Sequence, residues 1–369
     1  MEASEMKSVR LVVMMMMMMF LCVSAKSKLV PCLFIFGDSL ADNGNNNRLN
    51  TSAKANYKPY GIDFLDSRPT GRFTNGRTTV DIIAQLLGFN KFIPAYATLN
   101  SSFNLLSGAN YASGGSGILR QTGTHMGQNI CLKKQIKHHQ IMVSRISDLL
   151  GSKRSQELLN KCLYWVEMGN NDYINNYFVP WFYSSGNLYT PQQFALILIQ
   201  KYRHHVMELY NYGARMIALV GLGQIGCTPN AIWTYGTSNG STCVSFMDDA
   251  VQLFNERLVT LVDELNNAFV DTKYIYINSY EIGSSIDPIA LGFKVWNVGC
   301  CGGLENGQCK PLEIPCENRR EYVFWDSFHP TEAYNFITAS KIYKAYNLSY
   351  SYPMDISDLV HSFEQINIA

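Results

Sequence analysis

Short apolar segments alternate with longer amphipathic segments along this chain, and this alternation is the strongest constraint on its fold. The apolar segments, which we expect to be strands, are 33–36, 163–168, 216–220 and 274–277. The segments whose spacing of apolar residues predicts helices are 75–87, 132–150, 190–213 and 251–269. Strands that are apolar on both faces and separated by helices are typical of a parallel sheet covered on both sides. The sequence therefore predicts an α/β domain.

Two of these helices have recognisable start signals. Asn75 can cap the helix that runs to Leu87, and the Thr190 hydroxyl precedes Pro191, a residue favoured at the first helical position. Gly213 lies near the end of the helix that Thr190 begins.

Polar turns follow three of the predicted strands. They are Gly37-Asp38-Ser39-Leu40, Gly169-Asn170-Asn171-Asp172 and Gly221-Leu222-Gly223. In open parallel sheets the ligand site lies at the carboxyl ends of the strands, so these turns should share one edge. A turn needs no serine at position 39, whereas an active site does need a nucleophile. The sequence therefore predicts Ser39 as a catalytic serine.

A serine hydroxyl needs a neighbouring base to become a nucleophile at neutral pH. Among seven histidines, His329 stands out because Asp326 precedes it by three residues in "FWDSFHP". This spacing can place carboxylate and imidazole on the same side of a turn, where the acid orients the ring. Alone, the string equally fits a structural helix start. The other histidines have weaker contexts, as doublets in predicted helices or without a nearby partner: His125, His138, His139, His204, His205 and His361.

Two further segments offer hydrogen-bond donors for an oxyanion. In "GANYASGGSGI", residues 108–118, the backbone N–H groups near Gly114 and Gly115 are free of bulky side chains. The Asn171 side chain could donate to the same oxyanion. Each segment also has a structural interpretation, as a flexible glycine loop and as a helix cap respectively.

The order of these motifs in one chain resembles the GDSL lipase/esterase family of the SGNH-hydrolase superfamily, specifically its plant branch. The resemblance extends from about residue 32 to 347. It includes "FGDSLADNGNNN", "GRFTNGRTTVDIIAQLLG", "GANYASGGSGIL", "GNNDYINNYF", "GLGQIGCTPN" and "VFWDSFHPTEA". The family often has serine where this chain has Asn170, a variable position at which we expect little effect.

This resemblance implies a role for each matched residue. It implies Ser39 as nucleophile, His329 as general base and Asp326 as the residue that orients the base. The implied oxyanion hole consists of the Ser39 backbone N–H, the Gly114 N–H with Gly115 as the adjacent alternative, and the Asn171 amide.

The resemblance also implies a fold and an activity. The implied fold is a three-layer α/β/α sandwich with a mainly parallel, flavodoxin-like sheet. The implied activity is that of a secreted serine esterase or lipase, which hydrolyses lipid acyl or acetyl esters through an acyl-enzyme on Ser39 without metal or cofactor. One alternative is an extracellular acyltransferase of cutin-synthase type. Another is a non-catalytic protein that binds cell-wall glycan or lipid.

The N-terminus has the features of a secretory signal peptide. Lys7 and Arg10 precede an apolar run from Leu11 to Val23, and small residues follow. The run is shorter than the roughly 17–25 residues of a membrane span, although an uncleaved signal anchor is the alternative. We therefore expect residues 1–25 to be removed, leaving 26–369 as one secreted domain in the cell wall or apoplast. Candidate N-glycosylation sites are Asn50, Asn100, Asn239 and Asn347.

The net charge limits the kinds of partner that the chain is expected to bind. The net charge of +1 argues against nucleic acid, so small or polymeric esters are the expected partners.

Of ten cysteines, Cys22 leaves with the signal peptide, and an odd number remains. The cysteines crowded between 300 and 316 include no C-x-x-C pair and no histidine, which favours disulfides over zinc. At least one thiol must then lack an intramolecular partner.

Overall fold

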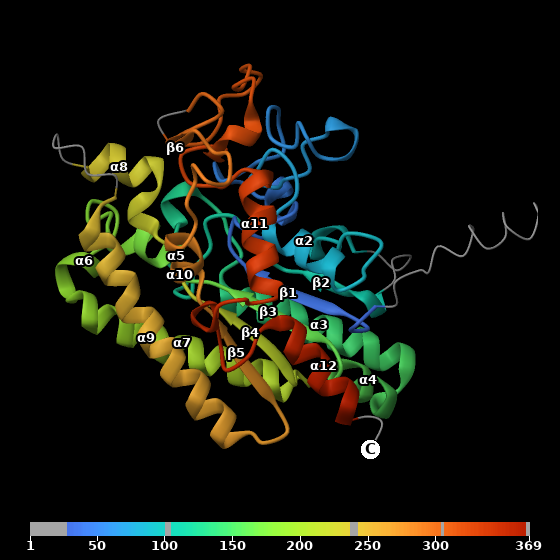
Figure 1. The fold of residues 1–369 in the computed structure, drawn as a ribbon. Helices are drawn as coiled ribbons and strands as arrows, with labels where there is room; N and C mark the ends of the chain where they lie inside the picture. The colour runs from blue at the N-terminus through green and yellow to red at the C-terminus, as the bar shows by residue number, and fades with distance from the viewer. Residues whose placement is uncertain (1–27, 100–104, 237–242, 304–305, 367–369) are drawn as a thin grey trace, which may run out of the picture.

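The computed structural model describes residues 28–99, 105–236, 243–303 and 306–366 (Figure 1). The predicted signal peptide lies outside the described residues. Two of the glycosylation candidates, Asn100 and Asn239, also lie outside them. Within the described ranges, no helix has the length and apolar character needed to cross a membrane.

A six-stranded sheet forms the centre of the molecule, with the strand order β2-β1-β3-β4-β5-β8. All neighbouring strands pair in parallel except β8, which is antiparallel to β5. The order of the first five strands is that of flavodoxin-like folds, so the predicted sheet is confirmed. The strands are β1 (Leu33–Gly37), β2 (Gly108–Asn110), β3 (Leu163–Glu167), β4 (Met216–Val220), β5 (Lys273–Ile277) and β8 (Ser351–Tyr352).

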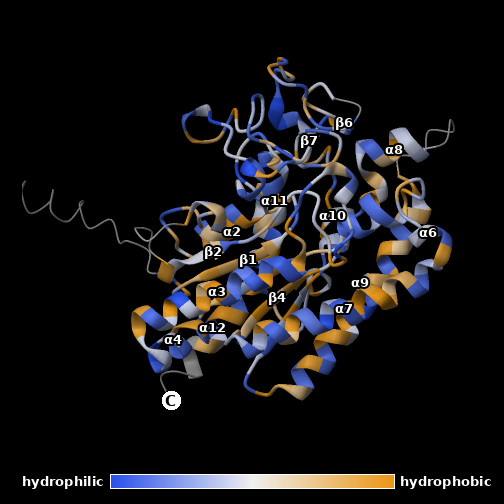
Figure 2. Ribbon diagram, turned by 180° about the vertical axis from the view of Figure 1, so that it is seen from behind, coloured by the Kyte–Doolittle hydropathy of each residue, from blue (hydrophilic) through white to orange (hydrophobic). Residues whose placement is uncertain are grey.

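Helices cover both faces of this sheet and complete the predicted three-layer sandwich. One layer contains α3 (Leu132–Leu150), α4 (Ser152–Leu159), α7 (Pro191–Asn211) and α9 (Ser245–Ala268). The other contains α2 (Thr79–Leu86), α10 (Ser279–Ser284), α11 (Glu332–Tyr343) and α12 (Ile356–Ile366). Alternate strand residues supply the two cores: Phe34 and Phe36 pack toward the α3 layer, while Leu33 and Ile35 pack toward the α2 layer. Figure 2 shows these hydrophobic strands between the helical layers.

A smaller cross-linked region lies above the carboxyl edge of the sheet. It contains the two-stranded sheet of β6 (Val295–Gly299) and β7 (Tyr322–Phe324), next to the loops that follow β1 (Figure 1). Its separate apolar cluster includes Tyr60, Phe73 and Trp325. Short helices at the same edge are α5 (Asn170–Asp172), the π-helical turn η6 (Tyr173–Tyr177), α6 (Ser185–Leu188) and α8 (Pro229–Tyr235).

The predicted helix starts agree with the structure at one site and differ at the other. Thr190 caps α7 in a reciprocal capping box with Gln193. The cap of α2 is Thr78, which forms a capping box with Asp81, so the prediction of Asn75 was wrong. The Asn75 Oδ1 atom instead accepts the Glu332 N–H at 2.8 Å and links the start of α11 to this loop.

Disulfides account for most of the cysteines, as predicted. The pairs are Cys32–Cys162, Cys227–Cys243, Cys300–Cys316 and Cys301–Cys309. Cys131 is buried and unpaired, which gives the expected odd thiol.

Candidate active site

Ser39, His329 and Asp326 form one hydrogen-bonded series at the carboxyl edge of the sheet. Ser39 follows β1, while the other two residues lie between β7 and α11. The Ser39 Oγ atom lies 2.8 Å from His329 Nε2, and His329 Nδ1 lies 2.8 Å from both Asp326 carboxylate oxygens. Asp326 and His329 are buried and Ser39 is half-buried. The arrangement can take a proton from Ser39 and hold it on an imidazole that a carboxylate stabilises.

The Asp326 carboxylate also shapes the turn that carries His329. Its Oδ1 atom accepts the backbone N–H groups of Phe328 and His329 at 2.9 and 2.8 Å. The Trp325 N–H donates to the His329 carbonyl at 2.7 Å, and the Phe73 ring packs 4.9 Å from the imidazole, measured between ring centres. The three-residue spacing of acid and base therefore places both groups on the same side of one tight turn.

The turn that carries Ser39 is held by a second buried carboxyl group, Asp38. Its Oδ1 atom accepts the Leu40 N–H at 3.0 Å. Burial raises the pKa of Asp38 to about 6, partly opposed by the Leu40 hydrogen bond and the nearby His329. Asp38 thus closes the turn around the serine.

The asparagines after Ser39 bind the loop that follows β2. The Asn45 side-chain amide donates to the Asn110 and Ala112 carbonyls at 2.9 and 2.8 Å. The Asn46 amide donates to the Gly114 carbonyl at 2.9 Å. These side chains satisfy backbone groups around the serine and fix the glycine segment beside it.

The two glycines considered for the oxyanion differ in the structure. The Gly114 N–H donates to the buried Asp42 carboxylate at 2.9 Å, so this donor is already engaged. Gly115 lines the cavity that contains Ser39. Asn171 also lines this cavity, and its amide nitrogen donates one hydrogen bond to the Ser116 carbonyl at 3.0 Å. An amide nitrogen carries two N–H donors, so a second remains for a ligand. This geometry favours Gly115 over the predicted Gly114.

Asp172 holds the same loop from its other side. Its carboxylate accepts the Ile118 and Leu119 N–H groups at 2.7 and 3.0 Å and the Thr122 hydroxyl at 2.6 Å. Burial raises the pKa of Asp172 to about 6, and these three donors partly oppose the shift. The last residue of the Gly-Asn-Asn-Asp motif is therefore a structural clamp beside Asn171.

A cavity of about 470 Å³ opens around Ser39 and extends beneath α10 and α11. Both members of the serine–histidine pair line it, together with Gly115 and Asn171. Much of its remaining lining is apolar and includes Leu40, Met126, Ile174, Ile225, Ile286, Pro288, Val323 and Ile342. Such a cavity suits an ester with a substantial hydrocarbon part.

A buried glutamate also lines this cavity. Glu167 is the last residue of β3, and its Oε2 atom accepts the Trp165 indole N–H at 3.1 Å. Burial and the nearby Asp38 carboxyl group raise the pKa of Glu167 to about 8. The side chain is therefore mainly protonated at neutral pH.

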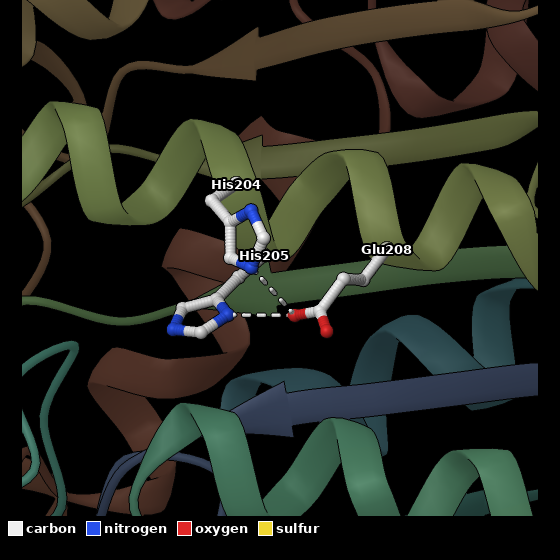
Figure 3. A group of neighbouring side chains, drawn as sticks. All are labelled: His204, His205 and Glu208. Atoms are coloured by element: carbon white, nitrogen blue, oxygen red, sulfur yellow. Dashed lines mark hydrogen bonds and ion pairs between the residues drawn. The ribbon is translucent and has the colours of Figure 1, made fainter.

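Among the residues that the structure describes, two side-chain groups have the composition of metal sites. His204, His205 and Glu208 converge on α7, where His205 Nδ1 and Glu208 Oε2 lie 2.9 Å apart (Figure 3). A direct hydrogen bond can satisfy this His–Glu pair without an ion. The other group contains Cys227 and Cys243, whose sulfurs are joined in a disulfide and so offer no thiolate. The histidine doublet of α7 therefore has one exposed member, His204, and one buried member, His205, that pairs with Glu208.

Sequence reasoning missed several residues that support the site. They are Asp42, Tyr60, Gln135 and, in its clamping role, Asp172. Gln135 on α3 exchanges two hydrogen bonds with the Gly37 backbone, at 3.0 and 2.8 Å. The Tyr60 hydroxyl donates to Asp326 Oδ2 at 2.7 Å. No motif spacing signals these contacts, because each joins segments far apart in the chain.

The fold and this site define the class of protein. A flavodoxin-like sandwich with a serine, a glycine loop, an asparagine and an Asp–His turn at its carboxyl edge is an SGNH-type hydrolase. Comparison with known proteins is consistent: residues 33–342 match the GDSL-like Lipase/Acylhydrolase family. This chain belongs to that family and is a carboxylic ester hydrolase.

Three similar proteins come from Arabidopsis thaliana. GDSL esterase/lipase At1g29670 of Arabidopsis thaliana is 52% identical over 336 residues, which cover 89% of this chain and 91% of that protein. GDSL esterase/lipase At1g29660 is 50% identical with the same coverage. GDSL esterase/lipase At5g45670 is 45% identical over 358 residues, covering 95% of this chain and 98% of the relative. The similarity therefore extends over nearly the whole length of both partners.

Proposed function

We propose that the protein is a secreted serine esterase that hydrolyses lipid acyl esters through an acyl-enzyme on Ser39. The observation that carries the proposal is the Ser39–His329–Asp326 hydrogen-bonded series, which borders a largely apolar cavity of about 470 Å³. The names of the relatives, each an esterase/lipase, support the same reaction class.

In the proposed reaction His329 Nε2 takes the proton of Ser39 as Oγ attacks the ester carbonyl. The oxyanion would be stabilised by the Ser39 N–H, the Asn171 amide and a glycine N–H, which we assign to Gly115. The alcohol then leaves with the proton held by His329. Water repeats the sequence on the acyl-enzyme, releases the acid and returns the proton to Ser39. Asp326 holds the imidazole and stabilises its protonated form throughout.

Export is the second part of the proposal. Residues 1–25 have the features of a signal peptide, and four disulfides are typical of an oxidising compartment. Asn50 and Asn347, two of the glycosylation candidates, are exposed. Expression of the full chain in a secretory host, with N-terminal sequencing of the exported protein, tests where cleavage occurs.

Hydrolysis of p-nitrophenyl acetate, butyrate and palmitate tests the enzymatic part. We expect turnover that Ser39→Ala abolishes, with a preference among chain lengths set by the apolar cavity. Well-folded protein that forms no free acid would contradict hydrolysis. Transfer of the acyl group to an added alcohol would then indicate an acyltransferase, and absence of Ser39 labelling by a phosphonate would indicate a binding protein.

A further inference from the structure

We propose that Tyr60 is a positioning residue for the reaction, acting on His329 through the Asp326 carboxylate. This inference rests on the proposed function and adds a residue outside the motifs that define the family resemblance. Tyr60 lies 266 positions before Asp326 in the chain, yet its hydroxyl donates to Asp326 Oδ2 at 2.7 Å. The tyrosine is fully buried.

The Tyr60 hydroxyl completes the set of donors around this carboxylate. Asp326 Oδ1 accepts the Phe328 and His329 backbone N–H groups, and Oδ2 accepts the Tyr60 hydroxyl. Both oxygens also lie 2.8 Å from His329 Nδ1. Tyr60 therefore fixes the side of the carboxylate that the backbone donors leave open. A carboxylate fixed on both sides holds the imidazole in one orientation toward Ser39.

The direction of the Tyr60 hydrogen bond is set by its surroundings. The Cys309 N–H donates to the Tyr60 oxygen at 3.1 Å, which leaves the phenol proton to point at the carboxylate. Burial and the charge of Asp326 raise the pKa of Tyr60 well above its usual value. The phenol therefore stays protonated and acts as a donor.

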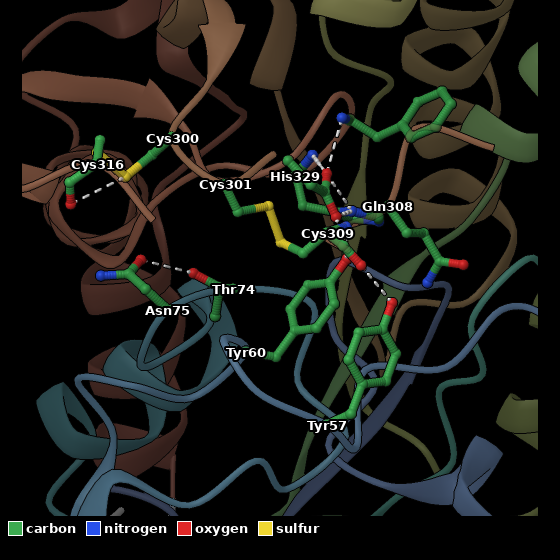
Figure 4. The surroundings of a disulfide bond; sticks show 12 residues. Tyr57, Tyr60, Thr74, Asn75, Cys300, Cys301, Gln308, Cys309, Cys316 and His329 are labelled. Carbon is green, nitrogen blue, oxygen red and sulfur yellow. Dashed lines mark hydrogen bonds and ion pairs between the residues drawn. A yellow bond between two sulfur atoms is a disulfide. The ribbon is translucent and has the colours of Figure 1, made fainter. Parts of the chain in front are cut away.

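A disulfide-linked loop holds Tyr60 in turn (Figure 4). Cys309, whose N–H binds the phenol, is joined to Cys301, and the Cys301 N–H donates to the Trp325 carbonyl next to Asp326. The Tyr57 hydroxyl donates to the Cys309 carbonyl at 2.9 Å, and its ring packs edge-on against Tyr60. The phenol is thus braced by the same cross-linked region that carries Asp326.

Tyr60→Phe tests the proposal because it removes the hydroxyl and keeps the buried ring. Hydrogen bonds to charged groups are the stronger class, so we expect kcat to fall about tenfold. KM should change less than about twofold, because Tyr60 does not line the cavity. Tyr164→Phe is the matched control: it also deletes the oxygen of a fully buried phenol, but that hydroxyl donates to the Leu159 carbonyl and has no contact with the cluster around Asp326. It should retain nearly full kcat.

A double-mutant cycle distinguishes positioning from general support of the fold. If Tyr60 acts through Asp326, adding Tyr60→Phe to Asp326→Ala should lower the residual kcat by less than about twofold. An undiminished tenfold loss in that background, an equal loss in Tyr164→Phe, or full activity of Tyr60→Phe would each overturn the proposal. Ser39→Ala is measured alongside: turnover that survives it would contradict the proposed function itself, whereas these three outcomes would contradict only the role of Tyr60.

Discussion

The two halves of the candidate site are held in place in different ways. Ser39 and Asn171 follow β1 and β3, neighbouring strands at the centre of the parallel sheet. His329 and Asp326 lie outside this sheet, in the region around β6 and β7. That region has a small apolar cluster of its own and two disulfides, Cys300–Cys316 and Cys301–Cys309.

The comparison shows where each half obtains its rigidity. Buried strands and internal carboxylates fix the nucleophile half, so its geometry depends on the main core and on many hydrogen bonds. The base half contains little regular structure, and covalent links replace part of the missing core there. The bond of 2.8 Å between Ser39 Oγ and His329 Nε2 joins the two halves. Substitutions on the sheet side should therefore change the rate of the chemical step directly. Substitutions on the base side should change that rate through the orientation of His329.

Apart from the loss of Ser39 itself, the largest effect is expected for Asn171→Ala on the sheet side. Loss of one oxyanion donor typically lowers turnover by about 10²–10³. The fold should persist, because Asp172 rather than Asn171 clamps the neighbouring loop. Measurement of kcat with p-nitrophenyl butyrate, alongside circular dichroism, checks both statements. The adjacent Asn170→Ala is the control and should stay within about threefold of wild type. Similar rates for the two variants would refute the oxyanion role of Asn171.

A smaller effect is expected from removing the Cys301–Cys309 disulfide on the base side. The enclosed loop is short, with a sequence separation of 8, so the chain-entropy model gives a loss of about 2–3 kcal/mol in the free energy of unfolding. Because this loop also holds Tyr60, the Cys301→Ala/Cys309→Ala variant should lose turnover even at temperatures at which it remains folded. Thermal unfolding and kcat are measured on the same preparation.

Cys300→Ala/Cys316→Ala supplies the matched comparison. Its disulfide closes a loop in the same region, with a separation of 16, and should contribute a similar stability. Neither cysteine contacts Tyr60 by any hydrogen bond in the described structure. We expect this variant to keep more of its turnover than the Cys301/Cys309 variant. The reverse order would mean that cross-linking stabilises the region as a whole and does not act through Tyr60.

The sequence predicted the parts of this molecule that depend on local pattern. The bounds of α3 at 132–150 follow from helical periodicity, and the Asp326–His329 turn follows from a three-residue spacing. The strand β2 was missed because it has three residues, Gly108–Asn110, and owes its conformation to pairing with β1 rather than to its own composition. Tyr60 was missed because its contact joins segments that only the fold brings together. Our assignment of Gly115 rests on the hydrogen bond from the Gly114 N–H to Asp42, which no local pattern specifies.

The smallest expected effect concerns Glu167, on the sheet side, and appears as a change of stability with pH. The folded protein raises the pKa of this carboxyl group from an ordinary value of 4.5 to about 8. The native state therefore holds a proton that the unfolded chain releases, so the contribution of Glu167 to stability should fall as pH rises from 4.5 to 8. Glu167→Gln removes this titration while keeping the shape of the side chain. We expect it to exceed wild-type stability at pH 7, by an amount that grows as pH rises from 4.5 to 8, and to show no gain below pH 4.5.

Urea unfolding of both proteins at several pH values measures this difference directly. Asp38, Asp42 and Asp172, whose pKa values burial raises to about 6, titrate in both proteins, so their contributions largely cancel in the comparison. Glu256→Gln, at an exposed position of α9, is the control and should give a difference that does not change with pH. A gain from Glu167→Gln that is equally large at pH 4 and pH 7 would show that better packing, and not the lost proton, stabilises the variant. A gain confined to neutral pH would show that the buried acid beside the nucleophile lowers the stability of the sheet side. The two halves would then differ in this respect, because the cross-links of the base side raise its stability.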